Sequence, residues 1–175
     1  CGEGTQIQMI KYKIRRGKIS YIFISHLHGD HYFGLVGLIT SFGLLSHQQD
    51  LHVFAPSPLR EIVELQLKVA KTTLPFQLYF HTINKEGLLM DDSKIEIRCF
   101  RTNHRIECYG FSFREKKKPR KLNLEKVVAA GIPASFYKKL EEGMDYVTKD
   151  DVLIKNEDVT IEAPKGRSYV FCADT

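Results

Sequence analysis

Three histidines and one aspartate lie within six consecutive residues, His26-Leu27-His28-Gly29-Asp30-His31. Neutral imidazoles and carboxylates are good zinc ligands. The segment directly follows residues 18–25, whose short, apolar and β-branched run predicts a buried strand. Polar groups packed at the end of such a strand cost free energy unless they have a partner. A metal site is therefore the favoured interpretation, and a histidine-rich surface loop is the alternative.

The spacing divides the ligands into two pairs. Alternate residues of an extended segment project to one side, so His26 and His28 can share one ion. Asp30 and His31 lie at the turn into the next element and can serve a second ion nearby. Gly29 is expected to permit the backbone bend between the pairs.

The remaining segments predict one domain of mixed α and β structure. Pro58 suits the first turn of a helix, and Ser57 is expected to cap it. A turn around Asp91-Asp92 is expected to join strands at 77–83 and 93–101, and residues 168–172 are expected to form a buried strand. Apolar patterns predict further strands at 51–55, 77–83, 93–101 and 109–114, and helices at 32–45, 58–71, 124–130 and 134–142.

The positive charge is concentrated in one stretch. The 175 residues carry a formal net charge of +5. Residues 114–126 hold seven cations against two anions, which accounts for the whole excess. Such a run suits a polyanion such as nucleic acid, and a solvated surface run is the alternative. It opens a basic insertion at about residues 114–150, with a small core of its own expected from Leu124, Val127, Val128, Ile132, Phe136, Tyr137 and Leu140.

Composition and cysteine spacing narrow the protein class. Hydrophobic residues make up 43% and charged residues 27%, which is typical of a globular domain. No apolar run approaches the roughly 20 residues needed to cross a bilayer, and no signal peptide is visible, so we expect no membrane association. No two of the four cysteines form a Cys-x-x-Cys pair, so reduced, mostly buried thiols in a cytoplasmic protein are expected: Cys1, Cys99, Cys108 and Cys172.

The metal segment resembles the His-x-His-x-Asp-His motif of the metallo-β-lactamase fold. Other segments are similar, in the right order, to those of one family with this fold, the ribonuclease Z family of tRNA 3′-processing endonucleases. They are residues 1–6, residues 25–35, Asn103-His104 with Tyr109-Gly110-Phe111, Gly131-Ile132-Pro133 with residues 140–143, and residues 165–175.

The resemblance implies a four-layer αββα sandwich, apparently incomplete at both ends. Residues 1–175 would form a single-domain fragment with the basic insertion serving as a tRNA-binding arm. His26, His28 and His104 would hold one zinc ion, Asp30 and His31 a second, and Asp174 would bridge the two. Asp30 would also be catalytic. Two further C-terminal histidines of the family pattern are expected to lie beyond Thr175, whereas His47, His52 and His81 are expected to be surface or strand histidines.

The resemblance further implies a zinc-dependent endoribonuclease. Hydroxide would attack the phosphodiester that joins precursor tRNA to its 3′ trailer. A cytoplasmic homodimer is also implied. The tRNA phosphates would contact Lys116, Lys117, Lys118, Arg120 and Lys121.

Three alternatives stay open. A hydrolase or phosphodiesterase of the same fold acting on a small substrate would not need the basic insertion. A nucleic-acid-binding module with an inactive metal site is disfavoured because the ligand set is intact as far as the chain runs. A structural zinc protein is disfavoured because structural zinc prefers cysteine-rich sites.

Overall fold

The structure is a computed structural model that describes residues 1–45 and 47–175. The chain divides into two compact units. The first unit comprises Cys1–Leu89, Ile97–Ser112 and Val170–Thr175, and the second comprises Met90–Glu96 and Phe113–Tyr169.

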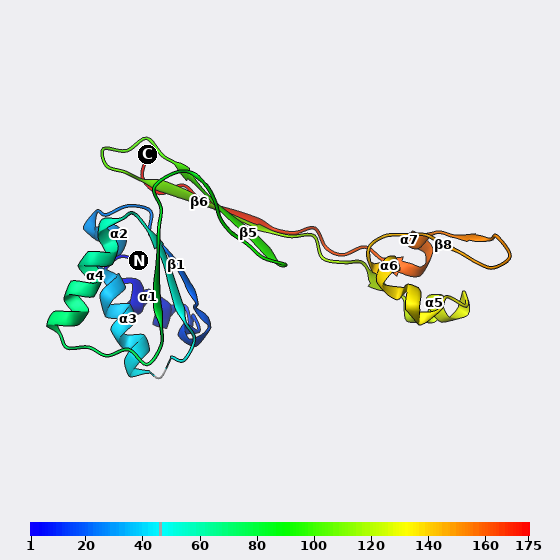
Figure 1. Cartoon of the computed structure of the whole chain (residues 1–175), viewed down its shortest axis with the longest axis horizontal. Coiled ribbons are helices and arrows are strands. Elements are labelled where there is room, and N and C mark those ends of the chain that lie inside the picture. Colours follow the sequence, from blue (N-terminus) through cyan, green and yellow to red (C-terminus); the bar gives the residue numbers. More distant parts are fainter. Residues whose placement is uncertain (46) are drawn as a thin grey trace. The chain divides into compact units, whose positions relative to one another are not determined.

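A three-stranded parallel sheet lies at the centre of the first unit (Figure 1). In its register Ile22 pairs with Val53, and Val53 with Phe80. The first strand is shorter than the predicted 18–25. The strands, in sheet order, are β1 (Tyr21–Phe23), β2 (Leu51–Ala55) and β3 (Leu78–Thr82).

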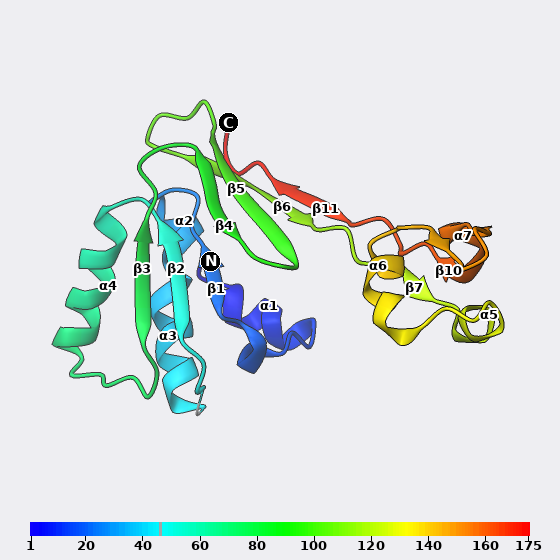
Figure 2. The ribbon, with the colours of Figure 1, turned by 45° about the vertical axis from the view of Figure 1, so that its right-hand side comes forward.

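Two helices, α3 (Gly34–Leu44) and α4 (Pro58–Val69), cover one face of this sheet (Figure 2). Pro58 begins α4 as predicted, but the Ser57 side chain forms no capping hydrogen bond. Ser57 itself has helical backbone angles, whereas a capping side chain needs an extended backbone at that position. The core beneath the helices includes Ile22, Ile24, Leu35, Ile39, Phe42, Val53, Leu59 and Val63.

The opposite face of the sheet carries aromatic rings, because alternate strand residues point to opposite sides. On that face, the centroid of the Phe23 ring lies 5.4 Å from the centroid of the Phe111 ring, which belongs to a second sheet. The first unit thus stacks helices, a sheet and part of a second sheet. The second sheet has the order β11-β6-β5-β4, with β4 (Gly87–Asp91), β5 (Ile95–Arg101), β6 (Tyr109–Glu115) and β11 (Ser168–Phe171).

Two expectations about the second sheet were wrong. Strand β4 was not predicted, so the turn at Asp92 joins β4 to β5 instead of joining residues 77–83 to β5. The Asp92 carboxylate accepts hydrogen bonds from the backbone N–H groups of Lys94 and Ile95. Strand β11 is exposed along its length, because it lies at the edge of the sheet.

The first unit also contains three short helices. Helix α2 follows β1 and contains Asp30 and His31. The predicted helix over 32–45 is therefore divided at Phe33, and no helix was predicted near the N-terminus. The elements are α1 (Thr5–Lys11), the 3-10 helix η1 (Arg16–Lys18) and α2 (Gly29–Tyr32).

The second unit has a small core of its own, formed by Val127, Ile132, Leu140 and Val159. Phe136 and Tyr137 pack against it, but Leu124 and Val128 are exposed. Helix α5 has only six residues and buries Val127 alone. The elements are β7 (Lys121–Leu122), α5 (Leu124–Ala129), η2 (Ala134–Phe136), α6 (Tyr137–Glu141), β8 (Tyr146–Val147), β9 (Leu153–Ile154), α7 (Asn156–Val159) and β10 (Thr160–Ile161).

All four cysteines are free thiols, but fewer of them are buried than expected. Cys99 and Cys108 are buried, Cys1 is half-buried and Cys172 is exposed. In the described part of the chain, no helix has the length and apolar character that a membrane span requires.

Candidate metal centre

His26 is the buried anchor of the site. It follows the end of β1, where the backbone N–H of Tyr109 donates to the carbonyl of Ser25. The His26 side chain has no exposed surface. Its Nδ1 lies 3.1 Å from the Ser25 hydroxyl and 3.4 Å from the Cys108 thiol. These contacts orient the ring so that Nε2 faces the other histidines.

His28 and His104 meet His26 through their ring nitrogens. His28 Nδ1 lies 3.0 Å from His26 Nε2 and 3.1 Å from His104 Nε2. His104 belongs to the loop between β5 and β6. The backbone N–H of Thr102 donates to the carbonyl of Cys108, which closes this loop beside the end of β1.

Asp174 follows β11, and its two carboxylate oxygens face different histidines. Oδ2 lies 3.7 Å from His26 Nε2 and 3.8 Å from His104 Nε2, whereas Oδ1 lies 3.4 Å from His31 Nε2. One ligand atom from each of His26, His28, His104 and Asp174 lies within 4.8 Å of the others. We call these four residues the histidine–aspartate group.

The donor set of this group fits a zinc ion. Three imidazole nitrogens and one carboxylate oxygen form a common tetrahedral ligand set. Burial lowers the pKa of His26 below the ordinary histidine value, and His31 acts in the same direction, while Asp174 partly opposes them. The lowered pKa favours the neutral imidazole, which is the form that binds a metal.

Asp30 and His31 lie beside the histidine–aspartate group. His31 Nε2 is 3.5 Å from Asp30 Oδ2, and the Asp30 side chain is 73% exposed. The structure therefore places Asp30 next to His31 and outside the group of four. His31 connects the two sets through its contact with Asp174.

Close backbone packing positions the turn that carries Asp30. A Cβ atom on Gly2 would lie 2.2 Å from the Asp30 carbonyl oxygen, so only glycine fits there. The expected reason for Gly29 was wrong. Gly29 begins α2 with a helical backbone, and its missing side chain leaves room for the Phe33 ring, which a Cβ would meet at 2.3 Å.

Arg105 also contacts the site and was not predicted. Its Nε donates a hydrogen bond to His28 Nε2 at 3.1 Å. Ser25 and Cys108, which hold His26, were missed as well. Sequence signals existed for Ser25 and Arg105, because each directly adjoins a predicted ligand. Cys108 had no such signal.

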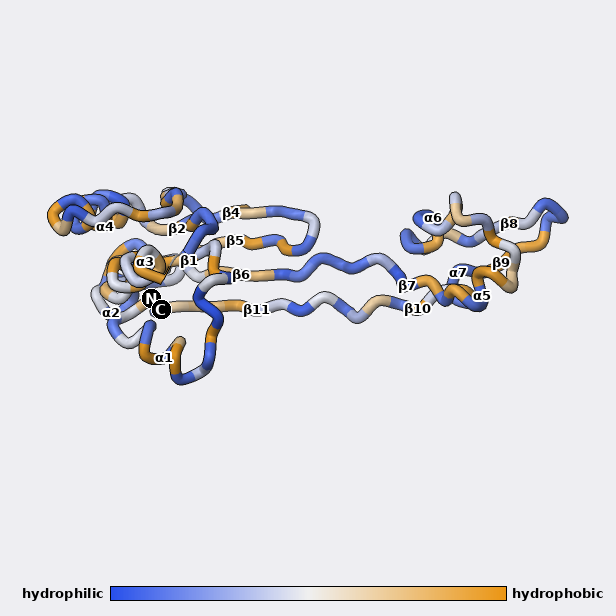
Figure 3. The backbone as a smooth tube through the Cα atoms, turned by 90° about the horizontal axis from the view of Figure 1, so that it is seen from below, coloured by the Kyte–Doolittle hydropathy of each residue, from blue (hydrophilic) through white to orange (hydrophobic). Residues whose placement is uncertain are grey.

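The predicted RNA-binding cations have different partners. The Lys116 ammonium pairs with Asp91 at 2.5 Å, and that of Lys117 lies 4.0 Å from Glu162. Arg120 Nε donates to the Thr160 hydroxyl at 2.7 Å. Lys118 and Lys121 are exposed and have no ion pair among the described residues. The tube between β6 and β7 is hydrophilic along this run (Figure 3).

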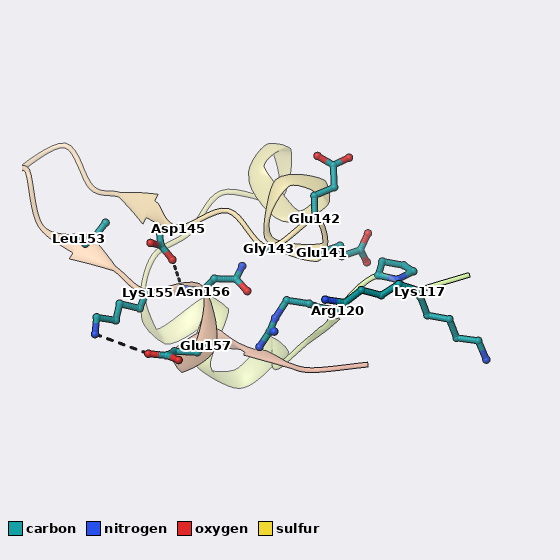
Figure 4. Close-up of a pocket in the computed structure, with 12 residues that line it drawn as sticks. Lys117, Arg120, Glu141, Glu142, Gly143, Asp145, Leu153, Lys155, Asn156 and Glu157 are labelled. Carbon is teal, nitrogen blue, oxygen red and sulfur yellow. Dashed lines mark hydrogen bonds and ion pairs between the residues drawn. The ribbon is translucent and has the colours of Figure 1, made fainter. Parts of the chain in front are cut away.

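A pocket of about 780 Å³ lies in the second unit and not at the histidines. Figure 4 shows Asp145 bonded to Asn156, and Lys155 paired with Glu157, along its wall. Its charges balance, because four cations face four carboxylates: Lys117, Lys118, Arg120 and Lys155 against Glu141, Glu142, Asp145 and Glu157. The pocket is therefore not a strongly basic site.

Residues 1–119 match the family described as Anti-Pycsar protein Apyc1. The chain belongs to this family. The match of the Apyc1 family includes every proposed ligand except Asp174 and ends before β7.

Curated relatives of this Apyc1-family chain include ribonuclease Z enzymes. The resemblance to the ribonuclease Z family seen in the sequence motifs is therefore confirmed. Ribonuclease Z of Synechocystis sp. is 36% identical over 176 residues, covering 100% of the chain and 54% of the relative. Ribonuclease Z of Bacteroides thetaiotaomicron is 36% identical over 177 residues, covering 100% and 56%. The chain thus spans about half the length of these curated relatives.

The crystal structure of the short form of human tRNase Z is also similar. It has a TM-score of 0.61 and 35% identity, and the match covers 66% of this chain and 51% of that one. The α/β class and the metallo-β-lactamase-like fold predicted from the sequence are thereby confirmed.

Proposed function

We propose that the protein is a zinc-dependent endoribonuclease that removes the 3′ trailer from precursor tRNA. The observation that carries the proposal is the histidine–aspartate group, gathered from the ends of β1 and β11 and from the β5–β6 loop. The alignment of ribonuclease Z relatives across the whole chain supports tRNA as the substrate.

The geometry supports a pair of ion sites that share Asp174. His26, His28 and His104 would hold the first ion, and Asp30 with His31 the second. Asp174 suits the shared position, because Oδ2 faces the first set and Oδ1 faces His31. When bound, such zinc ions would activate a water molecule and polarise a phosphoryl oxygen.

The chain's own residues would orient the reaction. Asp30, exposed beside His31, would hold the attacking water and accept its proton at the carboxylate. The water oxygen would bond to phosphorus while the bond from phosphorus to the tRNA 3′-oxygen breaks. That oxygen would take a proton from the solvent, and Asp30 would return its own to the solvent, which leaves a 3′-hydroxyl on the tRNA and a 5′-phosphate on the trailer.

The basic insertion supports a folded RNA as substrate. The exposed Lys118 and Lys121 are available for phosphate contacts, which position RNA without reading its sequence. Lys116 and Lys117 are also partly or largely exposed, and surface pairs such as theirs are weak enough to exchange for phosphate. Arg120, in contrast, is engaged within the second unit through Thr160.

The proposal includes the remaining expectations from the sequence. The insertion at about 114–150 would be a tRNA-binding arm on the metal-binding domain. The protein would act as a homodimer in the cytoplasm, and four free thiols are typical of a reducing compartment.

A phosphodiesterase with a small substrate is the second candidate. The match to the Apyc1 family favours it, because that match ends at residue 119 and so omits most of the insertion. The ribonuclease Z relatives favour the first candidate, because they align through the insertion to the end of the chain.

The test compares precursor tRNA with a small phosphodiester. We expect the zinc-loaded protein to cut precursor tRNA after the discriminator base, and Asp30→Asn to abolish cleavage while retaining tRNA binding. Asp50→Asn removes an exposed carboxylate elsewhere in the first unit and is the control. Hydrolysis of bis(p-nitrophenyl) phosphate without any cleavage of precursor tRNA would favour the second candidate.

A further inference from the structure

Residues 11–18 form a second basic segment, which lies in the first unit. None of its cations forms an ion pair within the described residues, whereas Lys116 and Lys117 of the insertion do. Four of the cations are exposed and Arg16 is half-buried. The segment holds five cations and no anion within eight residues: Lys11, Lys13, Arg15, Arg16 and Lys18.

Buried residues hold this basic segment at both ends. Met9 is buried in the core of the first unit, and Ile19 packs against that core. Between them, the Ile14 N–H donates to the Met9 carbonyl at 2.9 Å, and the Lys18 N–H donates to the Arg15 carbonyl at 3.2 Å. The cations therefore project from a defined backbone, so that binding a ligand requires little ordering of the chain.

Lys13 occupies the turn that ends helix α1. Its φ of 53° lies in the left-handed region, and the N–H of the next residue reaches back to the Met9 carbonyl. Glycine is the usual residue at such a helix end, because a Cβ atom destabilises the left-handed backbone. A lysine at this position adds a cation at a cost in backbone energy, which a purely structural turn would not require.

The basic segment is connected to the turn that carries Asp30 and His31. The backbone nitrogen of Cys1 donates to the His31 carbonyl at 2.8 Å, and Gly2 packs against the Asp30 carbonyl. Helix α1 then leads from this turn to Lys11. Three extended residues and two helical turns bring Lys11 to at most about 20 Å from Gly2. A strand of a few nucleotides at the metal centre therefore reaches the segment.

We infer that residues 11–18 form an RNA-binding surface that holds phosphates of the substrate next to the metal centre. The inference rests on the proposed function in that it assumes an RNA substrate. Unpaired lysine and arginine side chains bind phosphates without reading the sequence, and they release the counterions of the RNA. The exposed Tyr12 ring lies among these cations and is available for stacking on a base.

Two other partners fit the basic segment less well. After Lys11 the chain forms a turn and the short helix η1, so the segment lacks the continuous amphipathic helix of a membrane-surface anchor. Exposed apolar side chains on the same segment and on α1 also suit a second copy of the chain. A copy docked through the same face, however, would bring two sets of five like charges together, which is repulsive.

The measurement is the affinity of the zinc-loaded chain for a short RNA hairpin with a single-stranded 3′ extension, as a function of salt. Glutamine substitutions should weaken binding at least about tenfold at low salt and reduce the slope of log affinity against log salt by about 2.1–2.7, because three phosphate contacts are lost. The loss should be equal for two hairpins of different sequence. The three substituted residues are all exposed: Lys11, Arg15 and Lys18.

A second triple variant is the control. It makes the same charge change at other exposed positions of the first unit, Lys68, Lys71 and Lys85, and should alter the slope by less than about 1. Equal slopes in the two triple variants would overturn the inference. An unchanged RNA affinity in the first variant, together with its loss of binding to phosphatidylserine vesicles, would assign the segment to a membrane surface and would also overturn it.

Cleavage of precursor tRNA separates this inference from the proposed function. The expected slope change without any cleavage would retain the RNA-binding surface and reject the proposed activity. Cleavage with an unchanged slope would retain the proposed activity and reject the surface.

Discussion

The three histidines of the group face one another through defined ring nitrogens. His26 and His104 present Nε2, and His28 presents Nδ1. The other ring nitrogen of each histidine points away from the group. That of His26 contacts Ser25 and Cys108, and that of His28 contacts Arg105. Contacts of this kind hold a ring in place and set its tautomer.

Removing one of these rings should greatly weaken metal binding. We expect His104→Ala to lower zinc affinity by more than about 100-fold, because the remaining ligands can no longer enclose the ion. His52→Ala makes the same substitution outside the group and should change it little. Competition with a zinc-binding dye measures both, and equal affinities in the two variants would exclude His104 as a ligand.

His47 differs from the surface or strand histidine that the sequence indicated. It is 5% exposed, stacks on Phe42 and meets Phe76 edge-on. Neither ring nitrogen has a hydrogen-bond partner among the described residues. Replacing a buried unpaired polar ring with an apolar one removes a desolvation cost.

His47→Phe should therefore raise the free energy of unfolding by about 1 kcal/mol. Urea denaturation of the metal-free chain, followed by circular dichroism, measures this change. A loss of stability would mean that the imidazole nitrogens make a favourable contact that phenylalanine lacks.

At the scale of single residues, the sequence supported predictions that depend only on residues close together along the chain. Residues 26–31 are adjacent, so a local pattern was sufficient to propose ligands there. His104 and Asp174 came from resemblance, because their approach to His26 depends on strand pairing across the fold. Cys108 acts through a contact with His26 that no local pattern encodes.

Among the elements, those with clear periodicity were predicted well. Strand β2, helix α4 and strand β6 lie within one or two residues of their expected bounds. The short elements α1, β4 and α7 were missed. Such short segments are stabilised mainly by tertiary contacts and not by their own sequence pattern.

Asn156 is the central polar residue of the second unit. Its side-chain NH₂ donates to the carbonyls of Leu140 and Met144 at 2.8 and 2.9 Å. Its amide oxygen accepts from the Thr160 hydroxyl, to which Arg120 donates. These bonds connect α6, α7 and β10 around the small core.

Asn156→Ala should destabilise the second unit by about 3 kcal/mol, because it leaves the buried Leu140 carbonyl and Thr160 hydroxyl without this partner. Hydrogen exchange should then accelerate at the Val127 and Ile132 amides, which are bonded within that unit. Amides of β2 in the first unit are the internal control. Unchanged exchange at Val127 and Ile132 would show that the apolar core alone holds the second unit together.

At the scale of the whole molecule, the chain is similar both to the Apyc1 family and to ribonuclease Z enzymes. The match to the Apyc1 family covers residues 1–119, and the ribonuclease Z relatives align over the full chain. The proposed metal ligands lie in the first unit, and the basic stretch at 114–150 lies in the second. Chemistry and RNA binding should therefore respond to separate substitutions.

Replacing both Lys118 and Lys121 with alanine should weaken precursor tRNA binding and leave zinc affinity unchanged. The slope of log affinity against log salt should fall by about 1.4–1.8, because two phosphate contacts are lost. Replacing Lys68 and Lys71 makes the same charge change in the first unit, at exposed positions. Equal slopes in both double variants would show that the charge acts without a defined contact.

The most direct test of the account is the coordination of bound zinc. A crystal structure of the zinc-loaded protein, with anomalous diffraction at the zinc edge, locates each ion and its ligands. The account predicts an ion bound by His26 Nε2, His28 Nδ1, His104 Nε2 and the Asp174 carboxylate. Zinc bound elsewhere in the chain, with these four residues making no contact to an ion, would contradict it.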